Sequence, residues 1–156
     1  MKSATVHEIK QELLLKKPSE LVQLCQRLAR FKKENKELLT YLLFEAQDEQ
    51  GFVNSLKTEI EELFGTINTT QLYFAKKTLR KIIRLINKYC RYSDNKQTEV
   101  DLRLFFCLQL KNSGIPFERN TVITNLYNTQ VKKTRDMLAT LHEDLQYDYA
   151  KDIAVL

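Results

Sequence analysis

Apolar residues recur along this chain with the three- to four-residue spacing of amphipathic helices, and no stretch keeps the alternation of a strand. Only three glycines and two prolines are available to interrupt this pattern. Pro18 marks a helix start, while Gly65 and Gly114 mark helix ends, with Gly65 expected at a positive φ. Pro116 marks a loop, because it pushes the residue before it out of the helical region. We therefore expect an all-α protein.

Between these interruptions, the periodicity predicts six or seven helices with short connections. The expected helices cover residues 5–16, 18 to a weak break near 31–33, 34–45, 48–64, 72–92, 98–112 and 119–145. Residues 146–156 either extend the last helix or form a frayed tail. Asn68, Thr69 and Thr70 are candidate caps for the helix at 72–92.

The length of 156 residues is that of one domain with its own core, so we expect residues 1–156 to form a single all-helical domain. Consecutive antiparallel hairpins would give either a compact bundle or a short right-handed superhelical stack. No repeat at a fixed period is visible, which counts against a regular repeat protein.

The helix predicted at 72–92 has the most uneven charge distribution in the chain. No acidic residue occurs between Glu62 and Asp94, and at about 100° per residue the basic side chains fall within an arc of roughly 140°. These basic residues are Lys76, Lys77, Arg80, Lys81, Arg84, Lys88 and Arg91. Tyr73 shares the arc and Tyr92 borders it. We expect a helix about 31 Å long, with an apolar face for the core and a cationic face as the candidate binding surface.

A solvated or internally paired surface is one interpretation of this cationic face. The preceding predicted helix is acidic and would lie beside it in an antiparallel hairpin. The carboxylates of this acidic stretch, residues 38–65, are Glu45, Asp48, Glu49, Glu59, Glu61 and Glu62. Exposed ion pairs of this kind each contribute only about 0–1 kcal/mol, and runs of charge are commonly solvated faces.

Binding to a partner is the other interpretation, with Arg80, Lys81, Arg84 and Lys88 at the centre of the surface. Cationic faces suit an acidic protein or a second copy of the same chain. The alternative is sequence-independent binding of RNA or DNA, in which phosphates meet the cations and Tyr73 and Tyr92 stack on bases. A membrane-surface role is disfavoured, because core packing already requires the apolar stripe. We predict a binding or scaffold protein, with a protein partner or homodimer ahead of nucleic acid.

Catalytic and cofactor chemistry finds no support in the residue pattern. The chain has two histidines, His7 and His142, and the segment HEDLQ beginning at His142 lacks the second imidazole of a zinc HExxH site. Paired Glu-x-x-His motifs for a di-iron bundle are missing, and the isolated glycines form no phosphate-binding loop. We therefore expect a protein that is not an enzyme and that binds no metal or cofactor.

The three cysteines indicate a reducing compartment. Cys25, Cys90 and Cys107 are too scattered for a disulfide framework or a zinc site, and each lies among apolar residues. We expect all three to be buried thiols that act as small hydrophobic side chains. No run approaches the ~18 apolar residues of a membrane span. A cytoplasmic protein is the prediction.

Several stretches resemble a set of small all-helical bacterial proteins to which no activity is assigned. The segments are LTYLLFEAQDEQ, INKYCRYSDNKQTEVDLRLFFC, KNSGIPF and TLHEDLQYDY. The resemblance extends over most of the chain and implies a bacterial cytoplasmic protein with a helical fold. It implies no functional residue.

Overall fold

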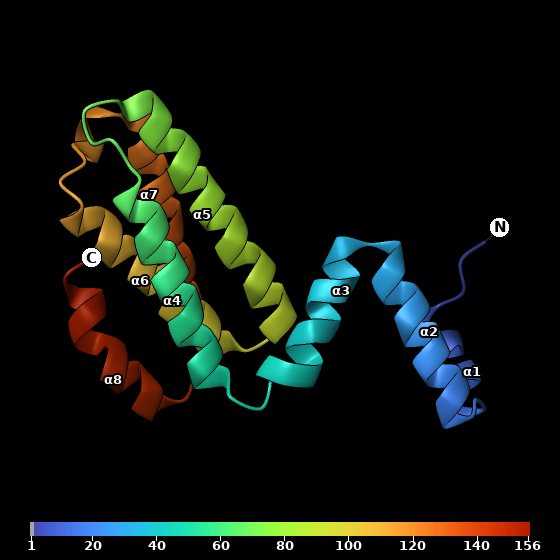
Figure 1. Cartoon of the computed structure of the whole chain (residues 1–156). Helices are drawn as coiled ribbons and strands as arrows, with labels where there is room; N and C mark the ends of the chain where they lie inside the picture. Colours follow the sequence, from blue (N-terminus) through green and yellow to red (C-terminus); the bar gives the residue numbers. More distant parts are fainter. Residues whose placement is uncertain (1) are drawn as a thin grey trace. The chain divides into compact units, whose positions relative to one another are not determined.

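A computed structural model describes residues 2–156, and within this part of the chain it contains eight α-helices and no strand (Figure 1). The prediction of an all-α protein is therefore confirmed, although the expected count of six or seven helices is too low. The residues divide into two compact units, Met1–Phe44 and Glu45–Leu156. The single-domain interpretation stays a prediction, and each unit is described by itself.

The first unit contains α1 (Val6–Leu14), α2 (Pro18–Phe31) and α3 (Lys33–Thr40). Thr5 begins α1 with a capping box, in which its hydroxyl accepts from the Glu8 N–H at 3.3 Å and its own N–H donates to the Glu8 carboxylate at 2.7 Å. The helices α2 and α3 pack against each other. The predicted break between them is confirmed at Lys32, whose backbone is extended.

Apolar side chains of the first unit are largely exposed. Leu28 on α2 is 59 % exposed and Phe31 is 76 % exposed. Cys25 also lies on this helix and is exposed, so the expectation that all three cysteines are buried is wrong at this position. Cys90 and Cys107 of the second unit are buried, as expected. The α-helical part of the predicted 34–45 helix ends at Thr40, and a π-helical segment η1 (Tyr41–Glu45) follows it.

The second unit is a bundle built around α6. Its elements are α4 (Glu49–Gly65), α5 (Leu72–Ser93), α6 (Lys96–Asn112), the 3₁₀ turn η2 (Phe117–Arg119), α7 (Thr121–Leu138) and α8 (Glu143–Ala154). The central helix α6 packs against α4, α5 and α7 (Figure 1). Because neighbours cover it on several sides, adjacent α6 residues such as Phe106 and Cys107 are both fully buried.

The helix ends differ from the sequence-based expectations at α4 and α5. Gly65 is the last residue of α4 and does not have a positive φ, whereas Gly114 (φ 72°) does. The predicted caps of α5 are also wrong. The Asn68 side chain closes its own turn by accepting from the Thr70 N–H at 2.9 Å, and the residue before α5, Gln71, makes no side-chain cap.

The helix predicted at 119–145 is two helices. The first, α7, ends at Leu138, and α8 begins at Glu143 after a turn. His142 caps the start of α8, because its ring accepts a hydrogen bond from the Asp144 N–H at 3.3 Å. Residues 146–156 are helical as far as Ala154 rather than frayed, and the Tyr149 hydroxyl anchors them by donating to Asp101 at 2.8 Å. Burial and this hydrogen bond raise the pKa of Tyr149 to about 12.

The three cysteines should differ in how fast they react with a thiol reagent. We expect Cys25 to react rapidly with a thiol reagent at about pH 8, while Cys90 and Cys107 react slowly in the folded protein. Burial raises the pKa of both buried thiols to about 12, so almost no thiolate is present at that pH. Absorbance-monitored labelling of the native protein checks this expectation. Cys25→Ser should remove the fast phase, and a second fast thiol would contradict the burial of Cys90 or Cys107.

Candidate functional site

The helix α5 has the predicted division into an apolar and a cationic face. Its buried side chains recur every three to four residues and include Leu79, Ile82 and Ile86, which are fully buried. Lys76, Arg80 and Arg84 lie four residues apart and therefore form one stripe along the helix. The amphipathic pattern of the sequence thus becomes a helix that is fixed to the bundle by one side and presents cations on the other.

Exposure differs among the predicted site residues. Lys77, Arg80, Lys81, Arg84 and Arg91 are exposed, and Lys76 and Lys88 are half-buried. Tyr73 is 72 % exposed. Tyr92 is only 8 % exposed and packs edge-to-face on the Tyr89 ring, with ring centroids 5.8 Å apart. Tyr92 is therefore a core residue, and its predicted place on the binding face is wrong, because angular position alone does not reveal neighbouring helices.

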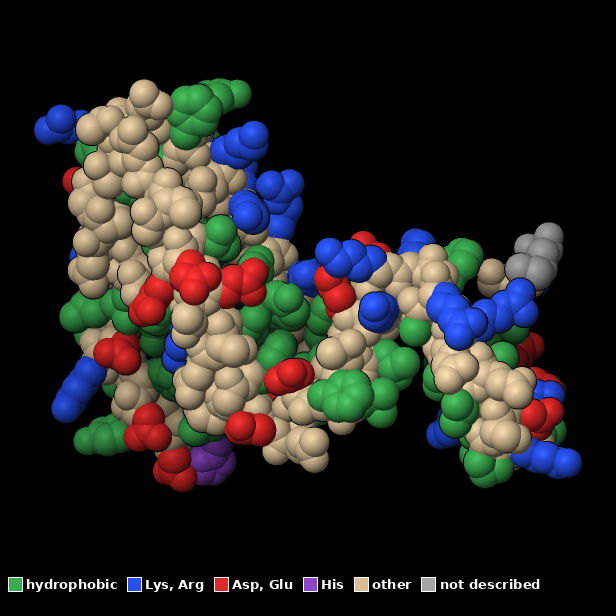
Figure 2. All heavy atoms as spheres, in the orientation of Figure 1, with side chains coloured by type: hydrophobic (Ala, Val, Ile, Leu, Met, Phe, Trp, Pro, Cys, Tyr) green, Lys and Arg blue, Asp and Glu red, His purple; other side chains and the backbone are tan. Residues whose placement is uncertain are grey.

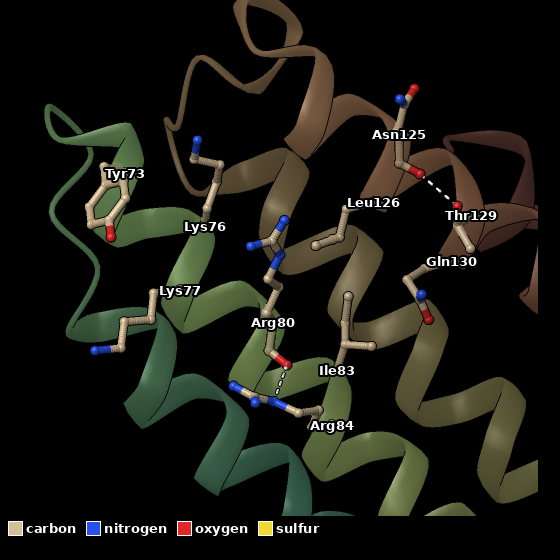
Figure 3. Close-up of a pocket in the computed structure, with 10 residues that line it drawn as sticks. All are labelled: Tyr73, Lys76, Lys77, Arg80, Ile83, Arg84, Asn125, Leu126, Thr129 and Gln130. Atoms are coloured by element: carbon tan, nitrogen blue, oxygen red, sulfur yellow. Dashed lines mark hydrogen bonds between the residues drawn. The ribbon is translucent and has the colours of Figure 1, made fainter.

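An open groove of about 680 Å³ runs between α5 and α7 (Figure 3). One wall belongs to α5 and carries Tyr73, Lys76, Lys77, Arg80 and Arg84. Ile83 of α5 and Leu126 of α7 contribute apolar surface. The opposite wall is uncharged and consists of Asn125, Thr129 and Gln130 from α7. The groove is thus cationic on one side and neutral on the other.

Local contacts orient the side chains of the groove. In Figure 3 the Arg80 side chain extends toward Leu126, whereas Lys77 points to the other side of α5. The Arg84 side chain turns back along the helix, and its Nε donates to the Arg80 carbonyl at 3.3 Å. On the facing helix the Thr129 hydroxyl donates to the Asn125 carbonyl at 2.7 Å.

Carboxylates of α4 do not neutralise most of the cationic face. Within residues 2–156, six of its cations form no ion pair, namely Lys76, Lys77, Arg80, Lys81, Arg84 and Arg91. Glu49 accepts hydrogen bonds from the Ser93 and Thr98 hydroxyls, and Glu61 accepts from Gln109 at 3.4 Å. Basic side chains gather along α5 and acidic ones over α4 as separate patches (Figure 2).

A buried arginine connects the two helices that form the walls of the groove. Arg103 of α6 is 4 % exposed and donates to Gln130 of α7 at 2.6 Å and to Asn87 of α5 at 2.9 Å. Its Nε donates to Glu99, one turn earlier on α6, at 2.7 Å. Since Gln130 also lines the groove, the same network orients part of the neutral wall. We name Arg103, Glu99, Gln130 and Asn87 the Arg103 network.

The Arg103 network and the α7 wall are not among the features predicted from the sequence. One signal was present, because Arg103 interrupts the apolar segment LRLFFC and lies four residues after Glu99. A lone charge in an apolar stripe with an opposite charge one turn away indicates a buried pair. The sequence holds no comparable signal for Asn125 or Thr129, because their role depends on which helix faces α5 across the groove.

Metal and cofactor chemistry gains no candidate from the described residues. No three His, Cys, Asp or Glu side chains among residues 2–156 come together as a metal ion would require. His142 serves as the cap of α8, and Glu143 and Asp144 lie exposed in its first turn. The expectations that the protein is not an enzyme and holds no metal or cofactor stay predictions. Across the same residues, no helix combines the length and the apolar character needed to cross a bilayer.

Comparison with protein-family models, with curated proteins and with solved structures finds no match to this chain.

Replacement of the buried arginine should destabilise the protein strongly. We expect Arg103→Met to lower the free energy of unfolding by about 3–5 kcal/mol, because it leaves a glutamate and two amides without their donor. The exposed Arg135 on α7 supplies the matched control, and Arg135→Met should change stability by no more than about 0.5 kcal/mol. Urea unfolding followed by circular dichroism measures both, and equal effects would contradict a structural role for the Arg103 network.

Reversal of the groove charges should leave the fold intact. Arg80 and Arg84 form no ion pair within the described residues, so Arg80→Glu combined with Arg84→Glu removes no stabilising contact with a carboxylate. We expect the free energy of unfolding to change by no more than about 1 kcal/mol. Thermal unfolding at low ionic strength measures it. A large drop in melting temperature would show that the cations are paired within the folded chain.

Proposed function

We propose that the protein is a binding module whose groove between α5 and α7 takes an acidic segment of a protein. The observation that supports this proposal is a set of cations that form no ion pair within residues 2–156, along one wall of a groove that also offers apolar surface. Lys76, Arg80 and Arg84 repeat at one-turn spacing, so carboxylates at the same spacing on a partner helix would meet them in turn.

Charge and apolar contacts have different parts in this mode of binding. Exposed ion pairs each contribute only about 0–1 kcal/mol, but they raise the rate of encounter and exclude basic partners. Burying one leucine-sized side chain contributes about 1.5–3 kcal/mol, and Ile83 and Leu126 supply the surface for it. The amides of Asn125 and Gln130 add hydrogen-bonding groups on the opposite wall. A mixed acidic and apolar segment therefore suits the groove better than a purely anionic one.

Nucleic acid fits the groove less well than an acidic protein segment. Binding of single strands combines phosphate contacts with several stacking rings, and of the two tyrosines predicted for this purpose only Tyr73 is exposed. Tyr92 lies in the core. The wall from α7 carries no cation, so a backbone of phosphates would be contacted from one side only. These observations favour protein over RNA or DNA.

The bacterial cytoplasm is the proposed location. The resemblance of four sequence stretches to all-helical bacterial proteins supports it. All three cysteines are also free thiols, which suits a reducing compartment.

Fluorescence anisotropy with two labelled probes tests the binding proposal. The first probe is a helical peptide with glutamates every fourth residue and leucines between them, and the second is a single-stranded oligouridylate. We expect the peptide to bind at low ionic strength, to weaken as salt is added, and to lose at least about tenfold in affinity in Arg80→Glu/Arg84→Glu. Lys132→Glu/Lys133→Glu changes the net charge equally at exposed α7 positions outside the groove and should retain binding.

The two probes separate the possible outcomes. Binding of the oligouridylate but not of the peptide would replace the protein partner with nucleic acid. Failure of both probes at low ionic strength, or equal losses in the groove variant and its control, would exclude the groove as an anion-binding site.

A further inference from the structure

The helix α8 presents an acidic stripe to solvent. Asp144, Asp148 and Asp152 lie four residues apart and are all exposed. Tyr147 is 82 % exposed and lies about 100° around the helix from Asp148, so an aromatic side chain borders the acidic stripe. Within residues 2–156, Asp148 and Asp152 form no ion pair, and the Asp144 carboxylate lies 3.3 Å from Nδ1 of His142, the atom that accepts the hydrogen bond from the Asp144 N–H. Most of this acidic charge is therefore not neutralised within the chain.

The stripe on α8 matches the stripe on α5 in spacing and is opposite in charge. Lys76, Arg80 and Arg84 have the same four-residue repeat as the three aspartates, about 6 Å per step along a helix axis. The lengths also agree, because the 12 residues of α8 span about 18 Å. The α5 wall of the groove, from Tyr73 to Arg84, has the same number of residues and also spans about 18 Å.

Contacts within the chain hold α8 away from its own groove. The Tyr149 hydroxyl donates to Asp101 of α6 at 2.8 Å, and Gln97 of the same helix donates to Tyr149 at 3.4 Å. The ammonium of Lys111, also on α6, donates to the carbonyl of Val155 just after α8. The face of α8 that includes Tyr149 is thus attached to α6, and the aspartate stripe remains accessible to another molecule.

We propose that the groove between α5 and α7 takes the α8 helix of a second copy of this chain. This inference rests on the proposed function and names the acidic segment. Asp144, Asp148 and Asp152 of one copy pair with the stripe of cations of the other. Tyr147 supplies the apolar contact by entering the groove between Ile83 and Leu126. A two-fold arrangement makes the same contact twice, because each copy contributes one groove and one α8.

Charge reversal on each side of the contact tests the proposal by sedimentation velocity on the full chain. We expect the wild-type protein to dimerise at low ionic strength and to dissociate at about 1 M salt, where the Debye length is only about 3 Å. Arg80→Glu/Arg84→Glu and Asp148→Lys/Asp152→Lys should each raise the dissociation constant at least about tenfold. An equimolar mixture of the two variants should form a mixed dimer, since opposite charges face each other again in both contacts.

Two further variants control for net charge. Lys132→Glu/Lys133→Glu matches the groove variant, and Glu59→Lys/Glu62→Lys on α4 matches the α8 variant, with all four residues exposed and outside the groove. We expect both controls to dimerise like the wild type. Circular dichroism and thermal unfolding of each variant confirm that the fold is retained before association is compared.

Each contrary result identifies what has failed. A monomer at all concentrations at low ionic strength would overturn the proposal of self-association, and so would a dimer that survives both charge reversals. If such a protein still binds the glutamate–leucine peptide through Arg80 and Arg84, the groove remains a site for another acidic protein. If the peptide does not bind either, the proposed function fails as well.

Discussion

The buried guanidinium of Arg103 is the interaction on which the arrangement of α5, α6 and α7 depends. A charge removed from water is tolerated only when its donors find acceptors, and here Glu99, Asn87 and Gln130 provide them on three helices. Any shift of α5 or α7 along α6 would break a charge-assisted hydrogen bond in a medium of low dielectric constant. Apolar packing alone resists such sliding weakly, because one leucine contact replaces another. The network thus defines the distance between the two walls, and with it the width of the groove.

Arg103 and Arg80 have different roles, because the first arginine is buried and the second is exposed. Arg103 is buried between three helices, and its planar guanidinium fixes their geometry by directed hydrogen bonds. Arg80 lies on the outer face of α5, where water screens its charge and no carboxylate of the described chain pairs with it. Arg103 contributes to the uniqueness of the fold, whereas Arg80 gives the surface of α5 a positive electrostatic potential. Only the second is available to another molecule.

Local periodicity was sufficient to predict the helices, and it failed where the outcome depended on packing between distant segments. The α5 helix could be predicted closely, because apolar residues such as Leu79 and Ile86 share one arc. The break between α7 and α8 was missed, since Leu138, Leu141 and Leu145 continue the helical spacing across it. Cys25 has apolar neighbours along the chain but is exposed, because neighbours in the sequence do not determine what packs over a side chain. The α7 wall was beyond prediction, since no local pattern specifies which helix lies beside α5.

The stripe of like charges on α5 has a thermodynamic consequence for the whole molecule. Cations one turn apart repel each other by a few tenths of a kcal/mol per pair, so Lys76, Arg80 and Arg84 make the free protein slightly less stable than its apolar packing alone would. Any anion that occupies the groove relieves this repulsion and binds only the folded chain. By linkage, occupancy and folding stability rise together. The melting temperature of this protein should therefore rise with the fraction of molecules whose groove is occupied.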